Sequence, residues 1–249
     1  MAGDVNRLLR DMMKVIREQA ADVVWRSKQY RHMAHSMVLP KATLSPWAAD
    51  SAFVQLYELA KANTLVDVYR CYELWDLAGQ LKSVAGDVLE VGVWRGGTGV
   101  ILASAVKAFG KTAYLADTFS GVVKAGSNDS HYKGGEHADT DQQVVIDLAE
   151  AVGADNVCIL KGVFPDETSD KVSGPLAFLH VDVDVYESAR DVLDWALPRL
   201  SIGSVIVFDD YGFASCDGIT RLVEEFRNSH RNFLFLHNLN GHGVFVRLY

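Results

Sequence analysis

The feature that most constrains this chain is a glycine-broken apolar run over residues 88–98, with the sequence Val-Leu-Glu-Val-Gly-Val-Trp-Arg-Gly-Gly-Thr. The apolar start predicts a buried strand, and the glycines predict a tight turn that leads into a helix over residues 99–108. Because glycine has no side chain, such a turn lets the backbone come close to a ligand. The order of strand, glycine turn and helix is typical of α/β proteins that bind nucleotide-type cofactors.

The spacing of the glycines separates two kinds of cofactor turn. Dinucleotide-binding folds use G-x-G-x-x-G, whereas here three residues stand between Gly92 and the pair Gly96-Gly97. This spacing disfavours an NAD(P)-dependent oxidoreductase and indicates another cofactor of nucleotide type. The candidate binding residues in the turn are Glu90, Gly92, Gly96 and Thr98.

Composition places the chain among ordinary single-domain globular proteins. It has 249 residues, of which 49% are apolar and 22% are charged, enough for one α/β core with a helical addition. We expect a single domain over residues 1–249. Within it, residues 1–82 are expected to form a helical N-terminal extension or cap, and residues 83–249 the cofactor-binding α/β core.

Charge and hydropathy disfavour several kinds of partner. The net charge of −8 argues against nucleic acid, whose phosphates require clustered Lys and Arg. No signal-peptide core is present, and no run approaches the roughly 20 apolar residues that span a bilayer. We therefore expect no membrane partner and a cytoplasmic location. Cys71, Cys158 and Cys216 show no C-x-x-C pairing and are expected to be free thiols.

The N-terminal third predicts helices. Over residues 5–37, apolar side chains at helical spacing predict an amphipathic arm; they are Val5, Leu8, Leu9, Met12, Met13, Ile16 and Ala20. This arm either serves as a dimerisation or lid element or simply packs on the core. Ser45-Pro46 predicts the start of a helix that ends near residue 62. Thr64 predicts the cap of a further helix that ends near residue 81.

From residue 83 onward, apolar runs alternate with helical patterns, which predicts a doubly wound sheet. After the first strand, further strands are expected at residues 111–118, 156–161, 176–184, 204–210, 233–236 and 244–249, with helices at 99–108, 142–152, 187–197 and 217–228. The Asn240-Gly241 pair between the last two strands is typical of a hairpin. The predicted fold class is α/β, a Rossmann-like seven-stranded sheet that is mostly parallel and has an antiparallel C-terminal hairpin.

The second strand of this core ends in an acid, Asp117. A carboxylate there can accept hydrogen bonds from both ribose hydroxyls of a cofactor, although a lone Asp at a strand end also suits a turn cap. The polar, glycine-rich stretch over residues 119–141 follows it. Because long loops at the carboxyl end of a strand are usually functional, we interpret this one as a mobile substrate lid, with His131, Tyr132 and His137 as candidate contacts.

Four acids end two neighbouring strands. Asp182 and Asp184 are two residues apart and share a strand face, and Asp209-Asp210 end the next strand. So much like charge in a cleft favours a divalent cation with oxygen ligands. No Cys joins this cluster, and His180 is expected to be a core histidine deeper in its strand, so Mg²⁺ or Mn²⁺ is favoured over Zn²⁺. Helix capping explains one or two of these acids but not four.

Together these motifs resemble those of a known family. The turn at residues 88–98, the D-x-D-x-Y-E-S run that starts at Asp182 and the V-F-D-D-Y run that ends at Tyr211 are similar to motifs of class I metal-dependent sugar O-methyltransferases. These enzymes use S-adenosylmethionine (SAM) and form the macrocin and novobiocin-type group of antibiotic biosynthesis. The resemblance covers about residues 64–249. Val183 stands where glycine is expected in this group, which puts the identity of the acceptor in doubt.

The resemblance implies roles for particular residues. It implies that Asp182, Asp209 and Asp210 hold Mg²⁺ or Mn²⁺, and that Asp184 is the catalytic base, with Asp182 as the other candidate for that role. It implies that Phe164 lies against the adenine ring. The residues that it implies for SAM binding are Thr64, Glu90, Gly92, Gly96, Thr98, Asp117, Gly162, Val163 and Asp182.

The predicted function is therefore a SAM- and divalent-metal-dependent O-methyltransferase that acts on a sugar hydroxyl of a natural product or nucleotide sugar. The alternatives are methylation of a catechol or other small diol, an NAD(P)-dependent oxidoreductase, and a non-catalytic binding protein, which would not need the acid cluster. Arg70 either lies in the segment that closes over the methionine end of SAM or is a surface charge. The expected partners are a small-molecule acceptor and a second copy of the chain, bound through the N-terminal helices.

Overall fold

The computed structural model describes residues 8–9, 11–12, 28–30, 33–35 and 44–249, and its contacts divide the chain into two units, Met1–Pro46 and Trp47–Tyr249. In the first unit, strands β1 (Lys28–Tyr30) and β2 (Met33–His35) pair antiparallel. The helix predicted over residues 5–37 is wrong at these strands, because the apolar repeat behind it stops at Ala20. Residues 8–9 and 11–12 are helical, and the rest of the predicted arm lies outside the described residues.

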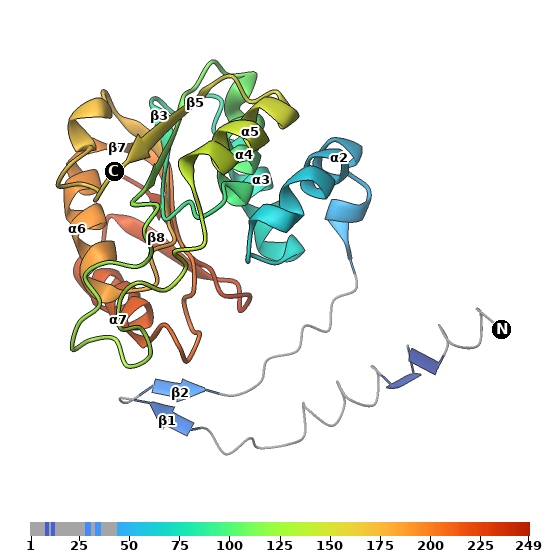
Figure 1. Cartoon of the computed structure of the whole chain (residues 1–249). Coiled ribbons are helices and arrows are strands. Elements are labelled where there is room, and N and C mark those ends of the chain that lie inside the picture. Colours follow the sequence, from blue (N-terminus) through green and yellow to red (C-terminus); the bar gives the residue numbers. More distant parts are fainter. Residues whose placement is uncertain (1–7, 10, 13–27, 31–32, 36–43) are drawn as a thin grey trace. The chain divides into compact units, whose positions relative to one another are not determined.

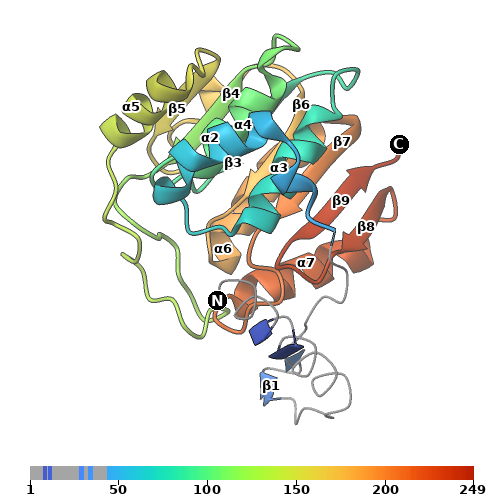
Figure 2. The same ribbon diagram turned by 90° about the vertical axis from the view of Figure 1, so that its right-hand side faces the viewer.

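The second unit is built on a seven-stranded sheet with the order β5-β4-β3-β6-β7-β9-β8 (Figure 2). The neighbours from β5 to β7 pair in parallel, whereas β9 is antiparallel to both β7 and β8. The seven strands are β3 (Asp87–Val91), β4 (Ala113–Asp117), β5 (Val157–Lys161), β6 (Leu176–Val181), β7 (Leu200–Phe208), β8 (Phe233–His237) and β9 (Gly243–Arg247). The predicted fold class, with its C-terminal antiparallel hairpin, is confirmed.

Helices cover both faces of this sheet, and each face has its own apolar core (Figure 1). The helices on one face are α2 (Ser51–Ala60), α3 (Val68–Gly79), α4 (Gly97–Lys107) and α5 (Gln142–Val152), and those on the other are α6 (Tyr186–Ala196) and α7 (Asp217–Ser229). Phe53, Leu74 and Ile101 are buried in the first core, and Leu179 and Phe208 in the second. Burial of such side chains is worth about 1.5–3 kcal/mol each, so the two cores stabilise the sheet edge that carries the acids.

Helices α2 and α3 begin at aspartates rather than at the predicted residues. Asp50 caps α2 by accepting from the backbone N–H groups of Ala52 (3.1 Å) and Phe53 (3.0 Å), while Pro46 lies in a short 3₁₀ helix, Pro46–Ala48. Asp67 caps α3. Ser45 and Thr64 are therefore not the caps of α2 and α3, because a carboxylate stands directly before each helix and is a strong N-cap acceptor. Ser45 directly precedes the 3₁₀ helix, and Thr64 Oγ1 accepts from Val66 N–H (3.0 Å).

The predicted extension over residues 1–82 does not match a single structural unit. From Trp47 onward its residues belong to the same compact unit as the sheet, and α2 and α3 share a core with α4. The predicted division at residues 82 and 83 stays a prediction. Among the described residues, no helix is both long enough and apolar enough to cross a membrane.

The strand order determines where a ligand can bind. The chain runs from β3 outward to β4 and β5 and then returns to β6 on the other side of β3. The crossovers on the two sides of β3 therefore lie on opposite faces of the sheet (Figure 1). In open α/β sheets, ligands bind at the carboxyl ends of the strands at this switch point. Both the glycine turn after β3 and the acids after β6 and β7 lie at this edge.

Candidate functional site

A cavity of about 330 Å³ lies at the carboxyl edge of the sheet. Most of the predicted site residues line it: Thr64, Gly92, Thr98, Asp117, Gly162, Val163, Asp182, Asp184, Asp209 and Asp210. Phe164, Arg70, Tyr132 and His137 also line it, whereas Glu90, Gly96 and His131 are not among its lining residues. The structure thus brings the predicted cofactor turn and the predicted acid cluster to one cavity.

The glycine turn brings β3 close to the loop that follows β6. Gly92 has a positive φ of 91°, and a Cβ atom there would overlap the carbonyl oxygen of Asp182. Gly96 also has a positive φ, of 89°, and a Cβ atom there would lie 2.9 Å from a methyl group of Val145. Only glycine fits either position without displacing a neighbour. These two glycines therefore have a structural role in addition to any contact with a ligand.

Glu90 lies beneath the turn rather than in the cavity wall. It is fully buried on β3, and its Oε1 atom is 2.8 Å from Nδ1 of His180 on β6. A Cβ atom at Gly99 would lie 2.7 Å from its other oxygen, Oε2. In this structure, the Glu90 side chain contacts His180 and lies close to Gly99 at the start of α4. Its predicted contact with the cofactor stays a prediction. His180 is the buried core histidine that the sequence indicated.

Asp117 is held in place by backbone amides. Its Oδ2 atom accepts from the N–H groups of Val93 (2.7 Å) and Trp94 (2.8 Å), and its Oδ1 atom accepts from Phe119 N–H (2.7 Å). The carboxylate therefore caps the turn and also lines the cavity. Each carboxylate oxygen has two lone pairs, so the two amides fill Oδ2 and one acceptor position is left on Oδ1. The turn cap is observed, and this position leaves room for one ribose hydroxyl rather than two.

The acids converge, but from turns rather than from strands. β6 ends at Val181 and β7 at Phe208, so the strand predicted over residues 176–184 is too long. Asp184 and Asp210 have positive φ angles of 65° and 60°. Ligand atoms of Asp182, Asp209 and Asp210 lie within 4.8 Å of one another. Strand alternation was thus the wrong reason for this convergence; the tight turns after the two strands produce it.

Burial and mutual repulsion change the proton affinities of these acids. Burial, together with the charges of neighbouring aspartates, raises the pKa of Asp182 and of Asp210 well above the ordinary value of 3.8, and burial also raises the pKa of Asp184. Like charges in a buried cluster resist simultaneous ionisation. A donor set of carboxylate oxygens alone suits a hard divalent cation, which would relieve this repulsion. The residues present therefore fit the predicted metal.

A thiol lies beside the acids, contrary to the prediction. Cys216, in the loop before α7, has its Sγ atom within 4.8 Å of ligand atoms of Asp184 and Asp210. The spacing along the sequence did not reveal this contact, because the loop folds back over the sheet edge. Burial raises the pKa of the Cys216 thiol and favours its neutral form in the metal-free protein.

Arg70 is a buried member of the site rather than a surface charge. It is 7% exposed, and its Nη1 atom lies 2.6 Å from Oδ1 of Asp209 and 3.9 Å from Oδ1 of Asp210. Its Nε atom donates to Asp67, the cap of α3 (2.9 Å), and its guanidinium lies over the ring of Phe213. The surface-charge interpretation is wrong because α3 packs against the acid edge of the sheet.

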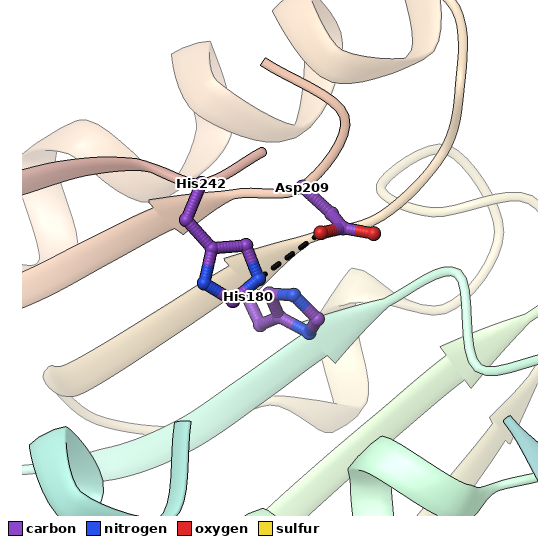
Figure 3. A group of neighbouring side chains, drawn as sticks. All are labelled: His180, Asp209 and His242. Carbon is purple, nitrogen blue, oxygen red and sulfur yellow. Dashed lines mark ion pairs between the residues drawn. The ribbon is translucent and has the colours of Figure 1, made fainter. Parts of the chain in front are cut away.

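His242 is a site residue that the sequence analysis missed. It is fully buried, and its Nε2 atom lies 3.0 Å from Oδ1 of Asp209 (Figure 3). Its Nδ1 atom lies 2.6 Å from Oε2 of Glu73 on α3. The sequence showed only a hairpin link around Asn240-Gly241. No local signal ties residue 242 to residue 209, because the register between β7 and β9 makes that contact.

The two flanking carboxylates change the pKa of His242, and the histidine changes theirs. Burial opposes the charge on the ring, but the close contacts with the carboxylates of Asp209 and Glu73 outweigh it and raise the pKa of His242. The same contacts outweigh burial at the acids and lower the pKa of Asp209 and of Glu73. Asp209 is therefore the readily ionised acid of the cluster, whereas Asp182 and Asp210 hold protons more tightly.

The long loop after β4 is anchored near its middle. Asp129 is buried and accepts from Tyr186 N–H (2.9 Å), and Ser130 N–H donates to Asp217 on α7 (3.0 Å). Nearer the cavity, the Tyr132 hydroxyl lies 3.3 Å from Nε2 of His137. The interaction with Tyr132 also lowers the pKa of Asp184, against the larger effect of burial. The lid assignment stays a prediction, and Tyr132 is the loop residue that reaches the acids.

Solved structures with a similar fold are O-methyltransferases. The O-methyltransferase NovP has a TM-score of 0.65 and 24% identity over 75% of this chain and 83% of its own. The calicheamicin methyltransferase CalS11 has a TM-score of 0.61 and 15% identity over 86% and 99%. The O-methyltransferase from Bacillus cereus in complex with SAH has a TM-score of 0.54 and 18% identity over 94% and 97%. The fold is thus that of the Rossmann-like O-methyltransferases.

The sequence assigns the chain to one family within this class. The chain belongs to the macrocin-O-methyltransferase (TylF) family, which it matches over residues 59–248. The predicted family and the enzyme class of its members are confirmed.

Two O-methyltransferases are each 33% identical to this chain over part of its length. The 8-demethyl-8-(2,3-dimethoxy-alpha-L-rhamnosyl)-tetracenomycin-C 4'-O-methyltransferase of Streptomyces olivaceus is 33% identical over 177 residues, 66% of each chain. The mycinamicin III 3''-O-methyltransferase of Micromonospora griseorubida is 33% identical over 162 residues, 59% of this chain and 62% of its own. The match thus spans just under two thirds of the length of these relatives.

Proposed function

We propose that this protein is a SAM-dependent O-methyltransferase that uses Mg²⁺ or Mn²⁺ and methylates a sugar hydroxyl of a natural product or a nucleotide sugar. The observation that carries the proposal is the convergence of four aspartates on a cavity whose other wall is the glycine turn after β3. Family membership supports the methyl transfer. The name of the Streptomyces olivaceus relative, which contains a rhamnosyl group, supports a sugar acceptor.

The cofactor would occupy the part of the cavity formed by the turn and by β4. Asp117 would use the acceptor position left on Oδ1 for a ribose hydroxyl, and Gly162, Val163 and Phe164 would pack against the adenine ring. Thr64, Gly92 and Thr98 complete this wall. Most of these contacts come from backbone or from side chains that the fold already holds, which is typical of a preformed cofactor site.

Asp182, Asp209 and Asp210 would hold the divalent cation. Their ligand atoms lie close together, and the raised pKa values of Asp182 and Asp210 record the repulsion that a cation would remove. A bound Mg²⁺ or Mn²⁺ would supply Lewis acidity, which lowers the pKa of an acceptor hydroxyl.

Asp184 would act as the base. It would accept the proton of the acceptor hydroxyl as that oxygen takes the methyl group and the sulfur keeps the electron pair of the carbon–sulfur bond, which would leave S-adenosylhomocysteine (SAH) as a neutral thioether. Tyr132 lines the same cavity and lowers the pKa of this carboxyl. Asp182 remains the other candidate base.

The proposal also covers an alternative acceptor, the location of the protein and its partners. A catechol or another small diol also presents two neighbouring oxygens, and it is the alternative acceptor. We propose a cytoplasmic protein without nucleic-acid or membrane partners. We also propose a homo-oligomer formed through the N-terminal helices; most of the arm predicted over residues 5–37 lies outside the described residues.

The test is methyl transfer by the purified protein. SAM and Mg²⁺ are incubated with deoxysugar nucleotides, glycosides and catechol, with and without EDTA, and products are identified by mass spectrometry. We expect a methylated sugar to form, and we expect EDTA to abolish its formation. Calorimetry should detect SAH binding and no comparable binding of NAD. Tight NAD binding without any response to SAH would refute the methyltransferase assignment.

A further inference from the structure

Two basic side chains contact the same oxygen of Asp209. Arg70 Nη1 lies 2.6 Å and His242 Nε2 lies 3.0 Å from Oδ1. The other carboxylate oxygen, Oδ2, points away from His242 (Figure 3). The side of Asp209 that faces α3 and the C-terminal hairpin is thus occupied by the protein itself, and Oδ2 is the atom left for a ligand.

The register of the sheet places His242 beside Asp209. In the antiparallel pair of β7 and β9, Phe208 is opposite Gly243. Continuing this register by one residue puts the first residue after β7, Asp209, opposite the last residue before β9, His242. The contact is therefore a consequence of strand pairing and does not depend on a mobile loop.

The imidazole ring is in turn fixed from α3. Glu73 Oε2 lies 2.6 Å from His242 Nδ1 and also accepts from Asn240 Nδ2 (3.0 Å). Glu73 and Arg70 are three residues apart on this helix. One helix therefore supplies both a direct contact to Asp209 and, through Glu73, the carboxylate that sets the orientation of the His242 ring.

We propose that His242 is a positioning residue for the metal site: held by Glu73, it fixes Oδ1 of Asp209 so that Asp209 offers Oδ2 alone to the cation. The proposal rests on the divalent-metal function proposed above. The physical reason is that a carboxylate free to rotate loses conformational entropy on binding a metal, whereas one already held by an ion pair with His242 and a hydrogen bond from Arg70 loses less. Such outer contacts around metal ligands typically change metal affinity roughly 10- to 100-fold.

Two substitutions separate the contact of His242 Nε2 with Asp209 from the contact of Nδ1 with Glu73. The amide nitrogen of Gln reaches the place of Nε2, so His242→Gln keeps a donor for Asp209. That of Asn is closer to Nδ1, so His242→Asn keeps the contact with Glu73 and loses the one with Asp209. Mn²⁺ affinity is measured by calorimetry and electron paramagnetic resonance on the full chain with SAH present, and the thermal midpoint is recorded for each variant.

We expect His242→Asn to weaken Mn²⁺ binding roughly 10- to 100-fold and His242→Gln to restore most of the loss. Glu73→Gln should fall between them and keeps the proposal testable if His242→Asn does not fold. His230→Gln is the matched control, because His230 also forms hydrogen bonds and contacts another ring but lies at the end of α7; it should bind Mn²⁺ like the unsubstituted protein. Asp210→Ala, which removes a proposed ligand, is the positive control.

Different failures have different meanings. If the unsubstituted protein binds Mn²⁺ and His242→Asn binds it equally well, the positioning role is wrong and the proposed function stands. Equal losses in His242→Asn and His242→Gln would show that ring volume matters rather than the donor at Nε2, and would also overturn the role. If the unsubstituted protein and Asp210→Ala both fail to bind Mn²⁺, the metal function itself is wrong.

Discussion

The two walls of the cavity are stabilised in different ways. The wall at the turn after β3 consists largely of backbone: Gly92 packs on a neighbouring carbonyl, and Asp117 accepts three amide hydrogen bonds. The wall at the ends of β6 and β7 consists of four aspartates, of which three have raised pKa values. Arg70 and His242 are the basic groups in contact with this second wall among the described residues.

The difference shows which half of the site is complete within the chain. Hydrogen bonds and close packing already satisfy the turn, so its geometry is set by folding. The acid wall places four carboxylates beside two basic groups. Folding therefore brings like charges close together, and their mutual repulsion opposes this arrangement. We therefore expect the turn to respond to changes in shape and the acid wall to changes in charge, and the predictions below test this contrast.

The largest effect is expected at Gly92. Gly92→Ala adds a methyl group that would overlap the carbonyl oxygen of Asp182 at a φ of 91°, and the combined strain should cost at least about 3 kcal/mol, a large share of the roughly 5–15 kcal/mol that stabilises a folded domain. Gly135→Ala is the matched control, because Gly135 has φ of 90° but open space around its Cβ position; it should cost about 1 kcal/mol. Urea unfolding measures both, and equal costs would contradict the close-packing explanation.

At the acid wall, charge rather than shape should decide activity. Asp184→Asn keeps the size of the side chain and the three proposed ligands, so SAH and Mn²⁺ should still bind while turnover falls roughly 10²- to 10⁴-fold. Steady-state kinetics and calorimetry on the same samples check this. If Asp184→Asn keeps near-full activity, while Asp182→Asn abolishes turnover without abolishing metal binding, the base is Asp182 and the two assigned roles are exchanged.

A smaller effect is expected at Asp117, where cofactor binding rather than turnover should change. Asparagine has one acceptor oxygen in place of two, so Asp117→Asn leaves some of the Val93, Trp94 and Phe119 amides without an acceptor, at a cost of about 1–3 kcal/mol. SAH affinity should fall about tenfold or more, whereas Mn²⁺ affinity should not change. Calorimetric titration with each ligand separates the two, and an equal loss of both affinities would show that the walls are coupled.

The sequence predicted the parts of the fold that depend on local pattern. The glycine turn, the alternation of strands and helices and the Asn240-Gly241 hairpin all come from residue types at fixed spacing. The caps of α2 and α3 were wrong because two acceptors compete within a few residues and the chain gives no local sign of which one is used. Element ends were likewise misplaced, most clearly at β6, where Asp182 lies beyond the strand.

The site could be predicted only where its residues form a motif. The two pairs of aspartates belong to short runs that end neighbouring strands, and the structure brings them together. Arg70, Cys216 and His242 reach the same place from a helix, a loop and a hairpin that are distant in sequence. Their contacts depend on helix packing and strand register, which no spacing in one sequence records.

The smallest expected effect is the dependence of stability on pH in metal-free protein. Asp182 and Asp210 have folded-state pKa values above the ordinary 3.8, so above about pH 4 the folded state holds protons that the unfolded chain has lost. The free energy of unfolding should therefore fall as pH rises through those folded-state values. His242 acts in the same direction, because its pKa is raised from 6.5 and its contribution is lost as pH rises through the folded value.

This pH dependence gives the acid wall its own signature. Asp209 and Glu73 have lowered pKa values, so they stay ionised from pH 5 to pH 8 and do not change the slope there. We expect the thermal midpoint of metal-free protein to fall by a few degrees over this range, since 1 kcal/mol corresponds to about 2–4 °C for a chain of this size.

Mg²⁺ should raise the midpoint more at pH 8 than at pH 5, because it binds ionised carboxylates. Asp210→Asn should reduce both the slope and the Mg²⁺ effect, whereas Asp117→Asn should leave both unchanged. An equal Mg²⁺ shift at the two pH values in all three proteins would mean that the cation does not act through this wall.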